Sequence, residues 1–126
     1  MACGFTSSRE SAEAGVREFH TRLDARQFDA ILDSASEELL ASADRQRLMD
    51  FLAQTRNEYG TLIDLNLLGA TVNKQSDATI VSLQYRARFT LKIAQEEFVF
   101  VVDDDSAQLL QFGIHALVGS TGDLQT

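Results

Sequence analysis

Two residues of this chain could together perform acid–base chemistry, His20 and Tyr85. An imidazole transfers protons near neutral pH, and a nearby proton donor would complete a simple catalytic pair. His20 follows Val16 by four residues and adjoins Phe19, so it falls at the edge of an apolar helical stripe. Two hypotheses follow. His20 is either a boundary histidine with one nitrogen in water, or it pairs with Tyr85 or Tyr59 in a pocket.

Other chemical motifs are weaker. His115 falls on the outward-facing alternation of a predicted strand, and two separate histidines without a cysteine partner make a poor zinc set. The acidic run at 103–106 lacks the glycine and distal glutamate of a calcium loop, and its residues favour a tight turn. No phosphate-binding glycine loop and no serine nucleophile elbow is present. The sequence therefore favours a protein with no catalytic activity, cofactor or metal, and the His20–Tyr85 pocket stays open as an alternative.

The charge of the chain excludes several partners. Its 126 residues carry a formal charge of −8, and the 11 basic residues are scattered without a basic run. A phosphate backbone or an anionic lipid surface would on average repel such a surface, so nucleic-acid binding is not expected. No apolar stretch approaches 18 residues, so membrane association is expected only through an anchor.

Cys3, the single cysteine, suggests such an anchor. Ala2-Cys3-Gly4 resembles the end of a lipobox, in which a small residue precedes the lipid-bearing first cysteine of a mature bacterial lipoprotein. Residues 1–8 are then a flexible tether, with Met1 standing where a signal segment would precede. This interpretation places the protein at the bacterial cell envelope. The alternative is an incidental thiol near a frayed terminus of a cytoplasmic protein.

Three helices are predicted in the first half of the chain. Apolar residues recur every three or four positions in 8–26, in 27–36 and in 43–59, and Gly60 suits the end of the third helix. Residues 37–42 are predicted to be a connection or a brief extended piece.

From Thr61 the apolar period changes to two, which is typical of strands. Strands are predicted in 61–72, 78–91, 96–102 and 107–118, and a change of phase before Gly69 predicts a bulge. Helices followed by consecutive strands with short links indicate an α+β fold with an antiparallel sheet. The prediction is one domain over 9–118, followed by a disordered tail at 119–126.

This order of elements resembles the nuclear-transport-factor-2-like (cystatin-like) superfamily, in which a curved sheet wraps a long helix to form a cone. The segment 85–117 is similar to the C-terminal part of small bacterial lipoproteins of this type. Glu96 or Glu97 fits their leading glutamate, and the turn at 103–106 fits their acidic turn, but residues 107–109 stand where a tryptophan is expected. The resemblance implies three helices packed on a curved four-stranded sheet, often with a pocket at the mouth of the cone.

The pocket candidates are Phe19, His20, Tyr59 and Tyr85. On the sheet wall only Tyr85 is expected to be polar, because acids such as Asp64 and Glu97 fall mostly on the opposite alternation. We therefore expect no buried general base on the sheet.

The outer face of the sheet is predicted to be unusually apolar. Phe98, Phe100 and Val102 lie on one side of the third strand, yet Val99 and Val101 lie on the other. Exposed apolar groups with a charged margin suit a self-complementary dimer. The candidate interface residues are Arg86, Arg88, Val99, Val101 and Leu109. The alternative is that a tail or helix covers this face within the monomer.

The sequence thus predicts a non-enzymatic, envelope-associated binding or interaction module, a homodimer that binds a small apolar ligand or a protein. One alternative is a small isomerase or dehydratase that uses His20 and Tyr85. The other is an acidic inhibitor-like or immunity-like protein that docks to its partner by charge.

Overall fold

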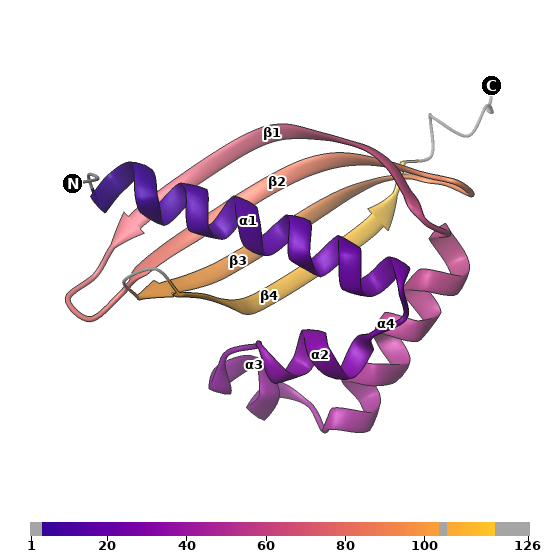
Figure 1. Cartoon of the computed structure of the whole chain (residues 1–126), viewed down its shortest axis with the longest axis horizontal. Coiled ribbons are helices and arrows are strands. Elements are labelled where there is room, and N and C mark those ends of the chain that lie inside the picture. The colour runs from indigo at the N-terminus through magenta and orange to yellow at the C-terminus, as the bar shows by residue number, and fades with distance from the viewer. Residues whose placement is uncertain (1–3, 104–105, 118–126) are drawn as a thin grey trace.

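The fold is α+β, with helices first and an antiparallel sheet after them. A computed structural model describes the backbone of residues 4–103 and 106–117, and the side chains from Ser8 onward. The helices are α1 (Gly4–Asp24), α2 (Phe28–Asp33), α3 (Glu37–Ser42) and α4 (Arg45–Tyr59). The strands are β1 (Leu62–Lys74), β2 (Thr79–Phe89), β3 (Ile93–Asp103) and β4 (Ser106–Ala116). Figure 1 shows the curved sheet with α1 running across one of its faces.

The sheet is a meander whose strands pair in chain order, β1-β2-β3-β4. The bulge predicted near Gly69 is confirmed, because Leu67 pairs with Tyr85 while Gly69 pairs with Gln84, which leaves Leu68 as an extra residue. A bulge increases the bend of a strand. β3 and β4 pair as far as Asp103 and Ser106, and residues 104–105 of the predicted turn lie outside the described part.

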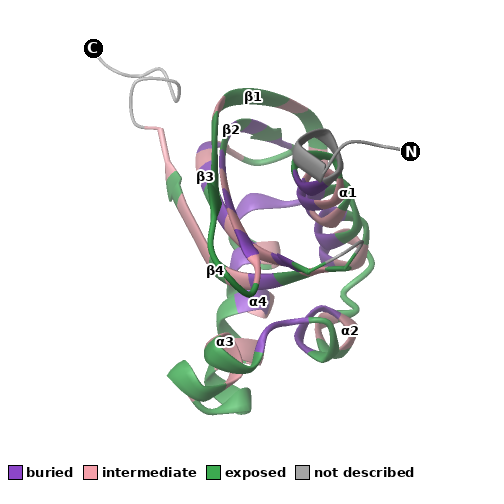
Figure 2. Cartoon of the chain, turned by 90° about the vertical axis from the view of Figure 1, so that its left-hand side faces the viewer, coloured by how far each residue is buried: buried purple, intermediate pink, exposed green. Residues whose placement is uncertain are grey.

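The core lies between α1 and the concave face of the sheet. The predicted stripe of α1 is buried, and every second residue of β2 from Val81 to Phe89 is buried against it. Phe98 in the middle of β3 is fully buried and contacts the ring of Phe19 edge-on. Figure 2 shows this buried layer facing α1, while no described helix covers the convex face of the sheet. Each fully buried large apolar side chain contributes about 1.5–3 kcal/mol.

Two sequence predictions about the helices are wrong. Residues 37–42 form a fourth helix, α3, because Ser36 caps it by accepting a hydrogen bond from the backbone N–H of Leu39. Helix α1 begins at Gly4, so residues 4–8 are helical rather than a tether. Cys3 and the predicted tail at 119–126 lie outside the described residues.

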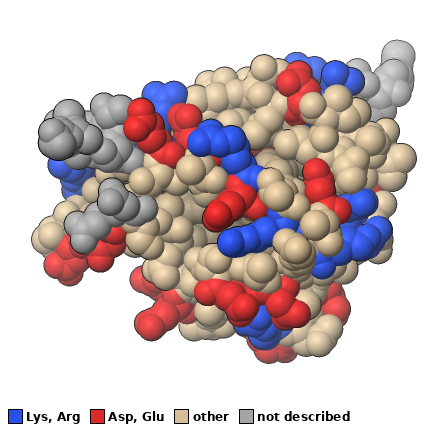
Figure 3. All heavy atoms as spheres, in the orientation of Figure 1, with Lys and Arg blue, Asp and Glu red and all other residues tan. Residues whose placement is uncertain are grey.

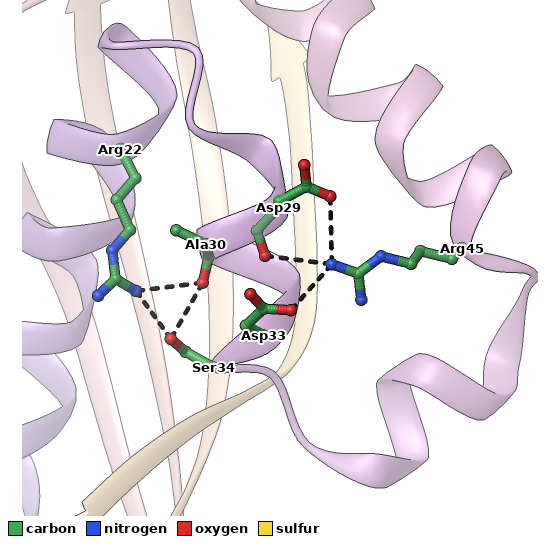
Figure 4. A network of polar contacts seen from close by, with 6 residues as sticks. All are labelled: Arg22, Asp29, Ala30, Asp33, Ser34 and Arg45. Carbon is green, nitrogen blue, oxygen red and sulfur yellow. Dashed lines mark hydrogen bonds and ion pairs between the residues drawn. The ribbon is translucent and has the colours of Figure 1, made fainter.

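The short helix α2 is held between its neighbours by two arginines (Figure 4). Arg22 of α1 donates to the Ser34 hydroxyl at 2.8 Å, and Arg45 donates to the carboxylates of Asp33 at 2.9 Å and Asp29 at 3.3 Å. The two ion pairs of Arg45 are exposed and so stabilise the fold little. They connect α2 to the start of α4, and backbone contacts of residues 35–36 with Leu109 join this layer to β4.

Gly60 makes the sharp transition from α4 to β1. Its φ is +84°, a conformation that residues with a side chain rarely adopt, and a Cβ there would overlap the Thr90 hydroxyl. No described helix is both long and apolar enough to cross a membrane.

Candidate functional site

An open cavity of about 430 Å³ lies between α1 and β1. Its polar lining residues are Glu13 and Arg17 of α1, Asp64 of β1 and Tyr85 of β2. The β1 side of the cavity is formed by Leu62, Ile63, Asp64, Leu65 and Leu67. The volume falls within the range of about 300–1,000 Å³ found for small-molecule sites. Four of the eight lining residues are apolar and four carry polar or charged side chains, so the cavity is more polar than most small-molecule sites.

Tyr85 is the most informative residue of this cavity. Its side chain is only 6% exposed, yet within the described part of the chain its hydroxyl makes no hydrogen bond. Burial raises the pKa of Tyr85 to about 12, and the Glu13 carboxylate adds to the shift while Arg17 opposes it. The phenol is therefore protonated at neutral pH and serves as a hydrogen-bond donor. Leaving a buried donor without an acceptor costs about 1–3 kcal/mol, so a group that accepts from it here is favoured.

Glu13 and Arg17 lie one turn apart on α1 but differ in their contacts. The Glu13 carboxylate accepts a hydrogen bond from Arg9 Nε at 2.7 Å. The exposed Arg17 guanidinium makes neither a hydrogen bond nor an ion pair with any described residue. Arg17 is therefore the cation of this cavity that is available to a ligand.

A second polar cluster lies deeper, where His20 of α1 meets Glu96 of β3. His20 Nε2 lies 2.9 Å from Glu96 Oε1 and 3.0 Å from Oε2, and Nδ1 lies 3.1 Å from the Val16 carbonyl oxygen. His20 is 3% exposed and Glu96 is 0% exposed. Because a carbonyl only accepts, Nδ1 carries a hydrogen, and one further proton is shared between Nε2 and the carboxyl group.

Glu96 overturns the expectation that the sheet holds no buried acid. It shares the inward alternation of Phe98, Phe100 and Val102, and that shared parity was the signal that could have placed it in the core. His20 is likewise no boundary histidine, because both of its nitrogens have protein partners and none of the ring is in open water.

The His20–Glu96 pair is enclosed by aromatic rings rather than open to a cavity. The centroids of Phe19, Phe98 and Phe89 lie 5.5, 5.7 and 6.1 Å from that of the His20 ring. Tyr85 lines the large cavity between α1 and β1, and His20 is not among the residues that line it. The pair thus joins α1 to β3 within the core.

The remaining pocket candidates lie elsewhere. Phe19 is a core residue that also borders a small cavity of about 30 Å³ beside α2. Tyr59 packs on Phe89 with their ring centroids 5.5 Å apart, and the Lys92 ammonium lies 5.5 Å from the centre of its ring. Burial raises the pKa of Tyr59 as well. Of the four predicted pocket residues, only Tyr85 lines the cavity between α1 and β1, and the sequence analysis missed Glu13 and Arg17.

The convex face carries most of the predicted interface residues. Arg86 and Arg88 are exposed there, and Val99 and Val101 are half-buried. The prediction that Leu109 lies at the interface is wrong, because Leu109 is 7% exposed and belongs to the core. Pairing shifts between Val99–Gln111 and Phe100–Leu109, so Leu110 is the extra residue and Leu109 points inward.

Charges of both signs are mixed on the helix-covered face, and acidic side chains gather toward the end that holds α2 and α3 (Figure 3). Within the described residues, no three His, Cys, Asp or Glu side chains form a group that could hold a metal ion. No family model matches the chain, and no curated protein sequence matches it. The functional argument therefore rests on the geometry of the cavity.

Proposed function

We propose that this protein is a non-enzymatic binding module that holds a small ligand in the cavity between α1 and β1. The observation that supports this most is the Tyr85 hydroxyl, a deeply buried donor that borders an open cavity and has no acceptor among the described residues. An acceptor on a ligand would satisfy it.

The contacts of His20 favour binding over catalysis. A general base needs a nitrogen that reaches the substrate, but both His20 nitrogens are engaged by Val16 and Glu96. Tyr85, with its pKa raised to about 12, is a poor proton acceptor at neutral pH. The isomerase or dehydratase alternative thus has neither group in a form suited to proton abstraction.

The fold part of the proposal is a nuclear-transport-factor-2-like cone. It is supported by the helices that precede the sheet, by the strand order β1-β2-β3-β4 and by the curvature of the sheet around α1. The fourth helix, α3, is a departure from the pattern of three helices that the sequence suggested.

A fragment screen by ¹H–¹⁵N NMR tests the binding function. We expect weakly binding fragments to shift the backbone amides of residues 13–17 and 62–67, and Tyr85→Phe to weaken the binding of those that carry an acceptor. Tyr59→Phe is the matched control, because Tyr59 packs in a separate cluster and should leave these affinities unchanged. If a diverse library shifts no cavity amide, the proposed function is wrong.

We further propose that the convex face of the sheet mediates a homodimer. Ile80, Val99 and Val101 form a half-buried apolar strip there, and Glu97 and Arg86 lie beyond its Val99 end. A two-fold pairing would bury the strip and set opposite charges against each other at its margin. Sedimentation should show a dimer that Val99→Glu dissociates, and a wild-type monomer at tens of micromolar would contradict the proposal.

The envelope location is a separate proposal that rests on Ala2-Cys3-Gly4. Expression of the full-length gene with a labelled palmitate should mark the wild-type protein, and Cys3→Ser should abolish the label. A protein that stays unlabelled with Cys3 intact would refute the anchor without affecting the cavity.

A further inference from the structure

We propose that the ligand of this cavity is an amphiphilic carboxylate, a molecule with one carboxylate group on an apolar body of modest size. This inference rests on the proposed binding function and names the chemical class that the function would select.

Two side chains, Arg17 of α1 and the inward-facing Tyr85 of β2, line the cavity without a hydrogen-bond partner among the described residues, and both are donors. Arg17 presents a guanidinium without a hydrogen-bond or ion-pair partner among the described residues, and Tyr85 presents a protonated hydroxyl without an acceptor among them. A guanidinium fits the planar geometry of a carboxylate, and hydrogen bonds to an ionised acceptor are stronger than neutral ones. One carboxylate could accept from both, because both side chains border the same cavity.

Neither carboxylate that lines the cavity, Glu13 or Asp64, is well placed to bind a cation. Glu13 is held by Arg9 at 2.7 Å, so an amine in the cavity would compete with an existing ion pair. Asp64 pairs in register with Arg88, on the alternation that faces the convex side. An ammonium ligand would therefore meet the Arg17 cation, and the carboxylate without an ion pair among the described residues, that of Asp64, lies on the outward alternation.

The rest of the ligand is expected to be apolar. Leu62, Leu65 and Leu67 have the inward alternation of β1, and Ile63 is an extra residue at a register shift. Ile63 is 51% exposed and Leu67 is 38% exposed, so both retain surface that an apolar body could cover. The donors that line the cavity are the Arg17 guanidinium, from the middle of α1, and the Tyr85 hydroxyl, from β2. Phosphate sites in proteins often use the backbone N–H groups of a helix N-terminus, and the residues that line this cavity include none, so a carboxylate fits better than a phosphate.

Three probes with one body and different head groups test the inference. We would titrate the full chain with 4-phenylbutyrate, 4-phenylbutanol and 4-phenylbutylamine by ¹H–¹⁵N NMR at neutral pH, up to about 10 mM, since weak small-ligand sites have Kd values near about 1 mM. The carboxylate should bind about tenfold or more tightly than the alcohol, and the amine most weakly, with shifts at residues 13–17 and 62–67.

Variants separate the head-group contacts from the apolar wall. Arg17→Gln should remove the preference for the carboxylate while leaving the alcohol affinity unchanged. Tyr85→Phe should weaken the carboxylate several-fold. Arg47→Gln is the matched control, because Arg47 is an exposed arginine on α4 that does not line the cavity, and it should change nothing.

The outcomes distinguish this inference from the function beneath it. If the three probes bind equally well in the cavity, the binding function stands and the carboxylate class is wrong. Tighter binding of the amine, or a preference for the carboxylate that survives Arg17→Gln, also overturns it. If none of the probes shifts a cavity amide while other fragments do, the ligand belongs to a different class.

Discussion

The buried contact between His20 and Glu96 predicts strong energetic coupling between helix α1 and strand β3. We would replace each residue by leucine, alone and together, and measure the free energy of unfolding in urea. Leucine supplies apolar volume without a charge or a hydrogen-bonding group, so the cycle isolates the polar interaction as far as a pair of substitutions can.

The expected magnitudes follow from the burial of the pair. With Glu96 0% and His20 3% exposed, removing either partner leaves the other without its hydrogen bond in the core, at a cost of about 3–5 kcal/mol. Removing both leaves no orphaned polar group except the Val16 carbonyl, which remains within its helix. The double variant should therefore lie within about 1 kcal/mol of the wild type or above it, because apolar replacements of buried ion pairs are often neutral or stabilising.

The neighbouring acid provides the control. Glu97→Leu changes the same residue type one position along, but Glu97 is exposed on the convex face and should alter the free energy of unfolding by no more than about 0.5 kcal/mol. The reasoning is refuted if the two single losses simply add in the double variant, or if Glu96→Leu costs no more than Glu97→Leu.

Three further predictions concern the backbone and the cavity. Gly60→Ala should destabilise by more than the roughly 1 kcal/mol of an ordinary Gly→Ala change, because φ is +84° and the added Cβ would overlap Thr90; thermal unfolding measures this. Ultraviolet titration should find one tyrosine, Tyr85, with a pKa near 12. Because the phenol of the unfolded chain loses its proton near pH 10, the free energy of unfolding of the wild type relative to Tyr85→Phe should fall as the pH rises from about 10 to 12. Leu109→Ala should cost about 2–5 kcal/mol and Leu110→Ala clearly less; equal costs would contradict the bulge that turns Leu109 inward.

Regular alternation made much of the sheet predictable. In β2 every second residue is apolar and buried, and the phase change before Gly69 marked the bulge in β1. The bulge in β4 could not be predicted in this way. Leu109 and Leu110 are both leucine, and no glycine or change of polarity in the sequence indicates which of them is the unpaired residue of the bulge. Helix α3 was missed even though Ser36 followed by two glutamates is a sequence signal for a helix start.

The polar pair in the core and the cavity residues were harder to predict than the fold. His20 and Glu96 are 76 residues apart, and sequence periodicity reports which face a residue occupies but not which residue lies across from it. Tyr85 was found because it is the only polar residue on the inward face of β2 between Val81 and Phe89. Glu13 and Arg17 were missed because charged residues beside an apolar stripe are usually solvated, and only the path of β1 over this part of α1 makes them border a cavity.

The order of the elements has a consequence for biosynthesis. At about 5–20 residues per second, the ribosome completes Glu96 about 4–15 s after His20, and the apolar side of α1 has no sheet to cover it during that interval. The nascent helix is therefore expected to be prone to aggregation until the sheet forms. Slowing translation between α4 and β3 should increase aggregation of the new chain, whereas the same delay placed after Ala116 should have little effect.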